Sequence, residues 1–225
     1  MTRPSKTAIA LLTALTAALG WSHPAVSGPT DKSLKTGETI FKTTCAACHG
    51  GDASGNLEMA APPLTGQTPA YLARQLGNFR DGIRYQGDDL STPAATMREI
   101  AKSLASESDL QAVAAYLGTL KAKPPKTPPQ PATGAQGKSL FGVCVSCHGK
   151  GGEGNAGLNA PRIAGLPVWY LEGQLRHFKA ETRGGHPSDA LGKQMVAIGE
   201  SLPDDDAVKA VAAFVAALPP TVKTP

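Results

Sequence analysis

Apolar side chains recur at helical spacing in corresponding stretches of the two halves of the chain. The last such stretch of each half has the spacing i, i+3, i+4, i+7, in Val113, Tyr116, Leu117 and Leu120 and again in Val211, Phe214, Val215 and Leu218. A middle stretch of each half is marked by Leu72, Leu76 and Phe79, and by Leu171, Leu175 and Phe178. No stretch alternates convincingly with the period of a strand, so the pattern predicts an all-α fold.

Polar residues mark where the last helix of each half begins. Ser106 and Asp109 have the spacing of a helix N-cap and its capping-box partner. Asp204 takes the cap position in the second half, where it follows Pro203.

A further short helix is predicted before each pair of cysteines. Each has a glycine and a phenylalanine four residues apart on one face, namely Gly37 with Phe41 and Gly137 with Phe141. The glycine lets another helix approach closely, and the candidates to pack there are Tyr116 and Phe214.

The sequence repeats itself when it is shifted by 99 residues. The matched positions include the cysteines and histidines, and the pairs Pro62 and Pro161, Tyr71 and Tyr170, and Gln75 and Gln174. Between the copies lies "KAKPPKTPPQP", which has five prolines and three lysines and is expected to be a semi-rigid extended spacer. We therefore predict two small domains at 28–120 and 132–225, joined by a linker at 121–131.

The N-terminus resembles an export signal. Arg3 and Lys6 precede the apolar run 8–20, and Ala25-Val26-Ser27 forms a plausible cleavage site. Residues 1–27 are thus predicted to be a cleaved signal peptide, which places the mature protein in the periplasm; an uncleaved anchor is the alternative. No later segment could cross a membrane, so any membrane association would be peripheral. The formal net charge of +4 is spread without a basic stripe, which argues against nucleic-acid binding.

All four cysteines lie in two short cassettes, "CAACHG" at 45–50 and "CVSCHG" at 144–149. Cys-x-x-Cys-His is the attachment motif of c-type haem, in which two thiols form thioethers with the haem vinyl groups and the histidine ligates iron. The pattern predicts two covalently attached haem c groups. Their predicted protein ligands are Cys45, Cys48 and His49, and Cys144, Cys147 and His148.

Other cysteine chemistry explains the cassettes less well. A zinc site built from four thiolates leaves the two trailing histidines without a cause. A thioredoxin-like pair requires a βαβ pattern, which is missing here. Disulfides within each cassette would close very small loops and stabilise little.

The second axial position requires another ligand. Met97 and Met195 occupy matched places about fifty residues after their cassettes, so we expect them to ligate iron rather than merely fill the core. Met59 is a minor rival for the first haem. In the second half the rivals are His177 and His186, which have no histidine counterparts and are treated as surface residues. Histidine with methionine fills both axial sites and raises the reduction potential.

Two further matched pairs are expected to support the haems. A carbonyl near Pro62 or Pro161 would accept the Nδ1 proton of the ligating histidine. Arg84 and Arg183 are expected to contact haem propionates, because arginine suits carboxylates geometrically. For the pair Arg80 and Lys179, propionate contact and solvated charge at a helix end are both open.

Together the two "CxxCHG" cassettes, the "P-x-[LI]-x-G" segments, the "YLxxQLxxF" helices and the late methionines resemble tandem dihaem cytochromes c, especially cytochrome c4. The resemblance covers nearly all of the mature chain and implies two class I cytochrome c domains. It implies axial pairs of His49 with Met97 and His148 with Met195, and it maps the family's proline onto Pro62 and Pro161. The long linker departs from the family and argues against a tight haem-to-haem interface between the domains.

The resemblance implies a periplasmic carrier that passes electrons between redox proteins, often from a quinol-oxidising complex toward a terminal oxidase. An alternative is the electron-accepting subunit of a dehydrogenase, such as a flavocytochrome or an alcohol-oxidising complex. A third possibility is an enzyme in its own right, such as a thiosulfate dehydrogenase or a haem peroxidase. No fifth cysteine exists to ligate iron and matched methionines fill both positions, so we predict that the chain is not an enzyme.

Overall fold

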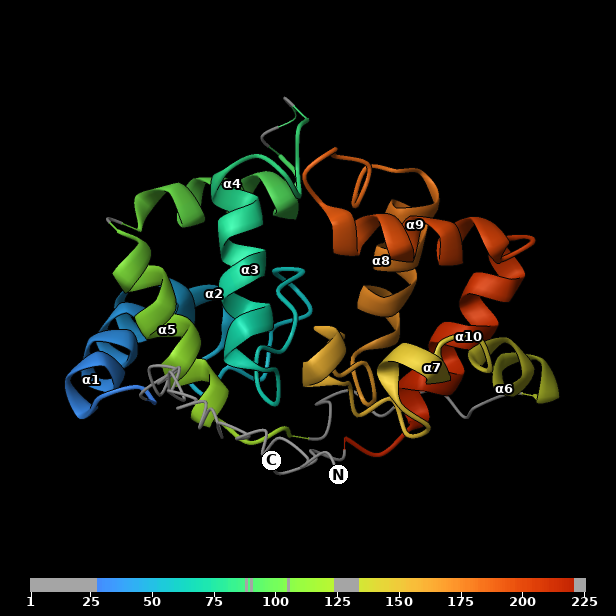
Figure 1. Ribbon diagram of the computed structural model, residues 1–225, viewed down its shortest axis with the longest axis horizontal. Helices are drawn as coiled ribbons and strands as arrows, with labels where there is room; N and C mark the ends of the chain where they lie inside the picture. The colour runs from blue at the N-terminus through green and yellow to red at the C-terminus, as the bar shows by residue number, and fades with distance from the viewer. Residues whose placement is uncertain (1–27, 88, 90, 105, 124–133, 221–225) are drawn as a thin grey trace, which may run out of the picture.

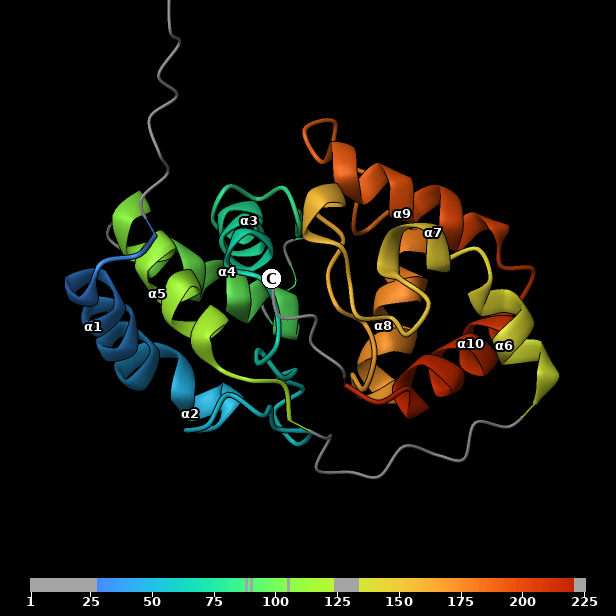
Figure 2. The same ribbon diagram turned by 60° about the horizontal axis from the view of Figure 1, so that its bottom comes forward.

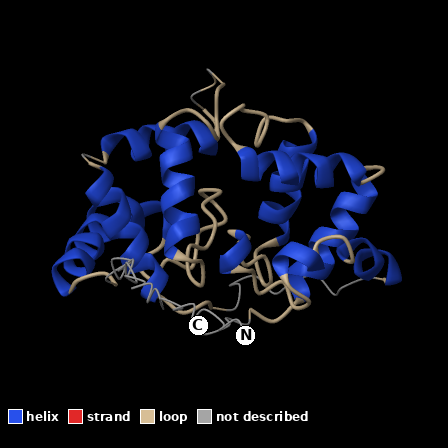
Figure 3. Cartoon of the chain, viewed as in Figure 1, coloured by secondary structure: helices blue, strands red, loops and turns tan. Residues whose placement is uncertain are grey.

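The computed structural model describes residues 28–87, 89, 91–104, 106–123 and 134–220. The predicted signal peptide and residues 124–131 of the predicted linker lie outside the described residues. The described part is helical and has no strand beyond isolated bridges of Asn56 with Ala61 and Asn155 with Ala160 (Figure 3). The all-α prediction is therefore confirmed.

The same succession of helices occurs in both halves. The first half has α1 (Asp31–Ile40), the π-helix η1 (Phe41–Cys45), α2 (Ala46–His49), α3 (Pro69–Arg80), α4 (Pro93–Ser103) and α5 (Glu107–Thr119). The second has α6 (Ala135–Phe141), α7 (Val145–His148), the 3-10 helix η2 (Ala156–Leu158), α8 (Val168–Lys179), α9 (Ala190–Ser201) and α10 (Asp205–Ala217). Among the described helices, none is long and apolar enough to span a bilayer.

Each half is a small bundle, and the two bundles lie side by side (Figures 1 and 2). In the first, α5 packs against α1 and α3, and α3 also packs against α4. In the second, α10 packs against α6 and α8, and α8 also packs against α9. The repeat in the sequence is thus a repeat of packing.

The contact of the first and last helices depends on the predicted glycine. A Cβ atom on Gly37 would overlap the backbone carbonyl of Ala112 and would lie 2.9 Å from Cβ of Tyr116. The close approach brings the rings of Phe41 and Tyr116 to a centroid distance of 5.7 Å. The second half repeats the arrangement, with a ring distance of 5.4 Å, in Gly137, Ala210, Phe141 and Phe214. The predicted packing is confirmed.

Replacing Gly37 by alanine is expected to destabilise the first half by roughly 1–3 kcal/mol or more, because the added methyl group forces α1 away from α5. Denaturant unfolding followed by circular dichroism measures this loss. Gly77→Ala is the matched control, since Gly77 lies within α3 and a Cβ atom added there would have nothing within 4 Å. The control is expected to be neutral or stabilising by up to about 1 kcal/mol. Equal effects of the two changes would contradict this account of the packing.

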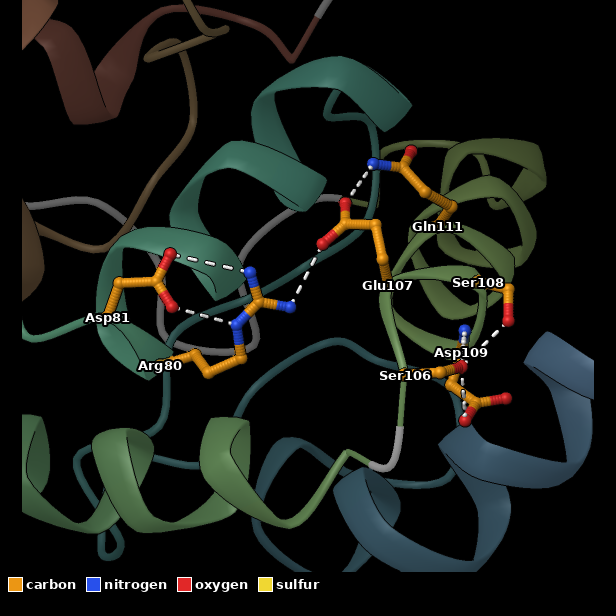
Figure 4. Close-up of polar contacts among 7 residues, drawn as sticks. All are labelled: Arg80, Asp81, Ser106, Glu107, Ser108, Asp109 and Gln111. Atoms are coloured by element: carbon orange, nitrogen blue, oxygen red, sulfur yellow. Dashed lines mark hydrogen bonds and ion pairs between the residues drawn. The ribbon is translucent and has the colours of Figure 1, made fainter.

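The predicted helix caps are present. Oγ of Ser106 accepts a hydrogen bond from the backbone N–H of Asp109 at 3.1 Å, and it donates to the Asp109 carboxylate at 2.9 Å (Figure 4). Oδ1 of Asp204 accepts from the backbone N–H of Ala207 at 2.8 Å. Each satisfies one of the amide groups that the first turn of a helix leaves unpaired.

Helices α4 and α9, which carry Met97 and Met195, were not expected from the apolar pattern. Each nevertheless begins at a recognisable cap. Thr92 accepts from the N–H of Ala95, with Pro93 in the first turn, and Asp189 accepts from the N–H of Gly192. The signal at 92–93 is that of a helix start, since proline is well tolerated in the first turn.

The two halves are in direct contact, contrary to the expectation drawn from the linker. The side chain of Arg74 donates to the carbonyl of Asn159 at 3.1 Å, and Gln67 donates to the carbonyl of Arg162 at 2.8 Å. A proline-rich spacer limits where the domains can go, but polar side chains on facing loops and helices decide whether they dock. That information is not contained in the linker.

Candidate functional site

A short turn of helix carries each cysteine cassette. Cys45 is the last residue of η1, and α2 then presents Cys48 and His49 before Gly50 ends the helix with φ of 80°. In the second half α7 carries Cys147 and His148 in the same way. None of the four thiols is in a disulfide.

The two histidines are held in one defined orientation. His49 is 4% exposed, and its Nδ1 lies 2.8 Å from the carbonyl oxygen of Pro62. Nδ1 of His148 lies 2.8 Å from the carbonyl oxygen of Pro161. A carbonyl only accepts, so Nδ1 carries the proton in both rings. Nε2 is then the unprotonated nitrogen and is able to ligate a metal.

The electrostatics of the histidines also favour ligation. Burial lowers the pKa of His49 and of His148, and the hydrogen bond to the proline carbonyl opposes this only in part. Both imidazoles are therefore neutral at pH 7, as a metal ligand must be.

The thiols do not form a site for zinc. Burial, followed by the neighbouring cysteine, raises the pKa of Cys45 and of Cys144 to about 11. Among the described residues no group of three or more histidine, cysteine, aspartate or glutamate side chains converges on one point. Thioether formation with a haem agrees better with these half-buried, unbridged thiols.

The methionines and the remaining histidines differ in their surroundings. Met97 lies within α4 and Met195 within α9, and both are half-buried, whereas Met59 is 50% exposed on the loop after the first cassette. His177 is exposed, and its Nδ1 contacts Oγ1 of Thr182 at 3.0 Å. His186 is half-buried, and its Nδ1 accepts from the N–H of Ser188 at 3.1 Å.

The arginines Arg84 and Arg183 come together between the two halves. Nη1 of Arg84 donates to Oε1 of Gln75 in its own half at 2.8 Å, and Nη2 crosses to Oε1 of Gln174 at 3.1 Å and to the hydroxyl of Tyr170 at 3.2 Å. Arg183 reproduces this pattern in reverse at 2.6, 2.9 and 3.3 Å, with Gln174, Gln75 and Tyr71. Each half therefore holds the arginine of the other.

This cluster is positively charged and has no hydrogen-bonded carboxylate among the described residues, although the charge of Asp189 also acts on Arg183. Arg183 is 9% exposed, and no carboxylate within the described residues pairs with either guanidinium. Burial, followed by the charge of Arg183, lowers the pKa of Arg84. Two neighbouring guanidinium groups without a bonded carboxylate would be stabilised by an added anion. The carboxylates of a haem would supply that charge, so these residues fit the cofactor that the cassettes imply.

Four members of this cluster were not expected to be functional. Tyr71 and Gln75 lie four residues apart on one face of α3, and Tyr170 and Gln174 lie on the same face of α8. The signal was available in the sequence, since Tyr71 and Gln75 match Tyr170 and Gln174 in the repeat.

The side chain of Arg80 points elsewhere. It pairs with Asp81 at 2.9 Å and with Glu107 at 2.9 Å, and so joins the end of α3 to the start of α5 on the surface (Figure 4). Its charge is balanced by carboxylates of the chain. The repeat mate Lys179 donates to the carbonyl of Leu202. The contacts of this pair within the described residues are those of charged side chains at helix ends.

The comparison with protein families gives a match in both halves. The sequence model of the family described as Cytochrome c matches residues 34–121 and again 134–219. Each match covers one of the two helical bundles and includes one cassette.

Individual proteins are similar over most of the chain. A "Thiosulfate dehydrogenase electron acceptor" of Stutzerimonas stutzeri is 35% identical over 190 residues, which are 76% of this chain and 77% of the relative. The crystal structure of reduced recombinant cytochrome c4 from Pseudomonas stutzeri superimposes with a TM-score of 0.68 and 26% identity, over 82% of this chain and 98% of that one. A thiosulfate dehydrogenase from Marichromatium purpuratum gives a TM-score of 0.66 and 33% identity, over 83% of this chain and 40% of that one.

Proposed function

The chain belongs to the cytochrome c family, carries two covalently attached haem c groups and transfers electrons between redox proteins, and on that premise we propose that it is a periplasmic carrier supplied by a dehydrogenase. The duplicated histidine site is the observation that supports this most. Both halves hold a buried, neutral imidazole in one orientation by a carbonyl 2.8 Å away. Two equivalent sites in one chain suit stepwise transfer of single electrons.

Export to the periplasm is part of the proposal. The basic residues Arg3 and Lys6, the apolar run 8–20 and the small residues at 25–27 support a signal peptide that is removed. Attachment of haem to cysteines is also compatible with an oxidising compartment, where unprotected thiols would otherwise pair.

We propose that the axial pairs are His49 with Met97 and His148 with Met195. The hydrogen bond to Pro62 or Pro161 fixes the tautomer of the histidine and increases its basicity toward iron. The haem supplies an iron that cycles between ferric and ferrous states, and methionine sulfur favours the ferrous one. With these residues as ligands, the chain itself would hold each iron from both sides, so small substrates would have no access to the metal and the protein would act as a carrier.

We propose that Arg84 and Arg183 contact haem propionates, a role supported by the positive charge of the cluster and by the lack of a carboxylate bonded to either guanidinium. Replacing Arg84 by glutamine is then expected to lower the midpoint potential of the first haem, because a positive charge near the iron favours the reduced state. A redox titration resolved for each haem measures the shift. The control is Arg80→Gln, which removes an arginine already paired with Asp81 and Glu107 and is expected to leave both potentials unchanged. No shift in the Arg84 variant counts against the role.

Partner proteins are proposed to dock beside the cassettes. Within the described residues, the large apolar side chains that are at least half exposed lie directly before a cassette (Val143) or on the loop that follows one (Leu57, Met59 and Leu158). Apolar contact surrounded by polar surface gives the weak, short-lived complexes that electron carriers need.

A thiosulfate-oxidising dehydrogenase is the donor that we propose, since a relative with 35% identity has the name of its electron acceptor. The test mixes the purified ferric holoprotein with thiosulfate, alone and with a catalytic amount of thiosulfate dehydrogenase, and follows haem absorbance. We expect reduction of both haems only when the dehydrogenase is present. Reduction by thiosulfate alone would assign the chemistry to this chain, and no reduction with the enzyme would exclude this donor. If thiosulfate dehydrogenase does not reduce the haems, a quinol-oxidising complex with its quinol is tested as the donor in the same assay.

A further inference from the structure

One buried arginine joins the two halves at a point away from the Arg84 and Arg183 cluster. Arg162 follows Pro161 in the loop before α8 and is 3% exposed. Its Nη2 donates to the carbonyl of Thr65 at 2.9 Å and its Nε to the carbonyl of Gly66 at 3.2 Å, both in the first half. Its Nη1 donates to the carbonyl of Ala164 in its own loop.

The contact is made from both sides. The side-chain amide of Gln67, which is 7% exposed, donates to the backbone carbonyl of Arg162 at 2.8 Å. Gly66 has φ of +71°, and a Cβ atom there would lie 2.9 Å from Nε of the arginine. Glycine is thus required both for the turn and for the approach of the guanidinium. We call Arg162, Thr65, Gly66 and Gln67 the Arg162 clamp.

The guanidinium of the clamp has no acidic partner among the described residues. Burial lowers the pKa of Arg162 to about 10, so the group is still charged at pH 7. A buried cation that is held only by carbonyl oxygens costs free energy to place, and truncating it leaves those acceptors unpaired. This cost in folding free energy indicates that Arg162 does more than cover apolar surface between the halves.

The clamp breaks the repeat. The position that matches Arg162 in the first half is Pro63, which has no side-chain donor, so the clamp exists once in the chain. A residue that served each haem site equally would be expected in both copies. The molecule has two haem sites but only one junction between its halves, so a residue without a repeat mate is more consistent with a role at that junction.

Both ends of the clamp adjoin the histidines. Pro161, whose carbonyl accepts from His148, immediately precedes Arg162 in the chain. Pro62, whose carbonyl accepts from His49, lies three residues before Thr65. The clamp therefore fixes the loop behind one histidine to the loop behind the other by direct hydrogen bonds.

We propose that Arg162 is a positioning residue for electron transfer between the two haems, through the hydrogen bonds by which it holds the loop of Pro161 against the loop of Pro62. This rests on the proposed ligation of iron by His49 and His148. Electron transfer depends steeply on the separation and orientation of the two centres. The charged contact behind the histidines adds to the bonds that Arg74, Arg84 and Arg183 make between the halves, and it helps to keep that geometry constant while partners dock and leave.

The test is the rate of electron exchange between the haems in Arg162→Gln, Arg162→Lys and the native holoprotein. Exchange broadening of haem methyl resonances in half-reduced samples gives the rate, extrapolated to zero protein concentration so that only transfer within one molecule remains. Arg162→Gln is expected to lower the rate by about tenfold, as it would if the halves of the variant were docked for only about a tenth of the time. Arg162→Lys keeps the charge and loses the three-way fork of donors, so it is expected to fall between the two.

The matched control is Arg176→Gln, which removes an exposed arginine of the same half that pairs with Glu172 and Asp205. It is expected to keep the native rate. An unchanged rate in Arg162→Gln, or an equal loss in the control, overturns the proposal. If Arg162→Gln does not accumulate as holoprotein, Gln67→Met removes the bond from the other side and is expected to slow exchange as well, and a native rate in that variant also overturns it. The axial ligands are read separately from the native haem spectrum, so an error in the proposed ligation is distinguishable from an error about the clamp.

Discussion

Serine in place of both Cys45 and Cys48 is expected to lower the haem content of the purified protein from two groups per chain to one. The first half should also lose its cooperative unfolding. Within the described residues its apolar core contains nine buried side chains, three of them alanine, and a core of this size depends on the bound group to hold the helices together. Haem absorbance per polypeptide and thermal unfolding followed by circular dichroism measure the two effects.

Two controls accompany this change. The matched pair Cys144→Ser with Cys147→Ser is expected to remove the other haem and leave the first half folded. Ser146→Ala alters the spacer of the second cassette and is expected to retain both haems, since the motif specifies only the cysteines and the histidine. Full haem content in either double variant would show that the thiols are not the attachment points.

Alanine in place of Met97 is expected to lower the midpoint potential of the first haem by roughly 0.1 V or more, because the identity of the axial ligand shifts haem potentials over about 0.8 V. Loss of the sulfur removes the ligand that favours ferrous iron. The weak far-red band of ferric haem bound to methionine sulfur should fall by half, and Met195→Ala should remove the other half. Absorbance spectroscopy during a redox titration measures both quantities.

Met59→Ala is the control for this assignment. Met59 is 50% exposed on a loop and has Leu158 as its repeat mate, so its loss is expected to change neither the potential nor the band. If the far-red band weakens in Met59→Ala and persists in Met97→Ala, the first haem has the other ligand.

Much of the fold follows from local sequence. Helical spacing marked the middle and last helices of each half, Ser106 and Asp204 marked helix starts, and Gly37 with Phe41 predicted the helix contact that the structure contains. These features depend on residues close in sequence, or on a single glycine that lets two helices approach closely. Each occurs in both copies of the repeat, which doubled the evidence for it. The helices of Met97 and Met195 were not predicted, although Met97, Ile100 and Leu104 have helical spacing and the cap at Thr92 was visible.

The junction between the halves was not predictable in this way. Arg84 meets Tyr170 across 86 residues, and Arg162 meets Gly66 across 96. Neither contact leaves a periodic signal, and the proline-rich linker gave the opposite expectation. Arg162 is invisible to an argument from the repeat, since its mate is a proline. Its contacts with the first half are known only from the hydrogen bonds in the structure.

The most direct test of the account is a spectroscopic redox titration of the native holoprotein with carbon monoxide added to the fully reduced sample. The account predicts two haems per chain, a far-red band to which both ferric haems contribute, and ferrous haems that do not take up carbon monoxide readily. A ferrous haem that binds carbon monoxide at once, or ferric protein without the far-red band, would contradict the claim that histidine and methionine close both irons.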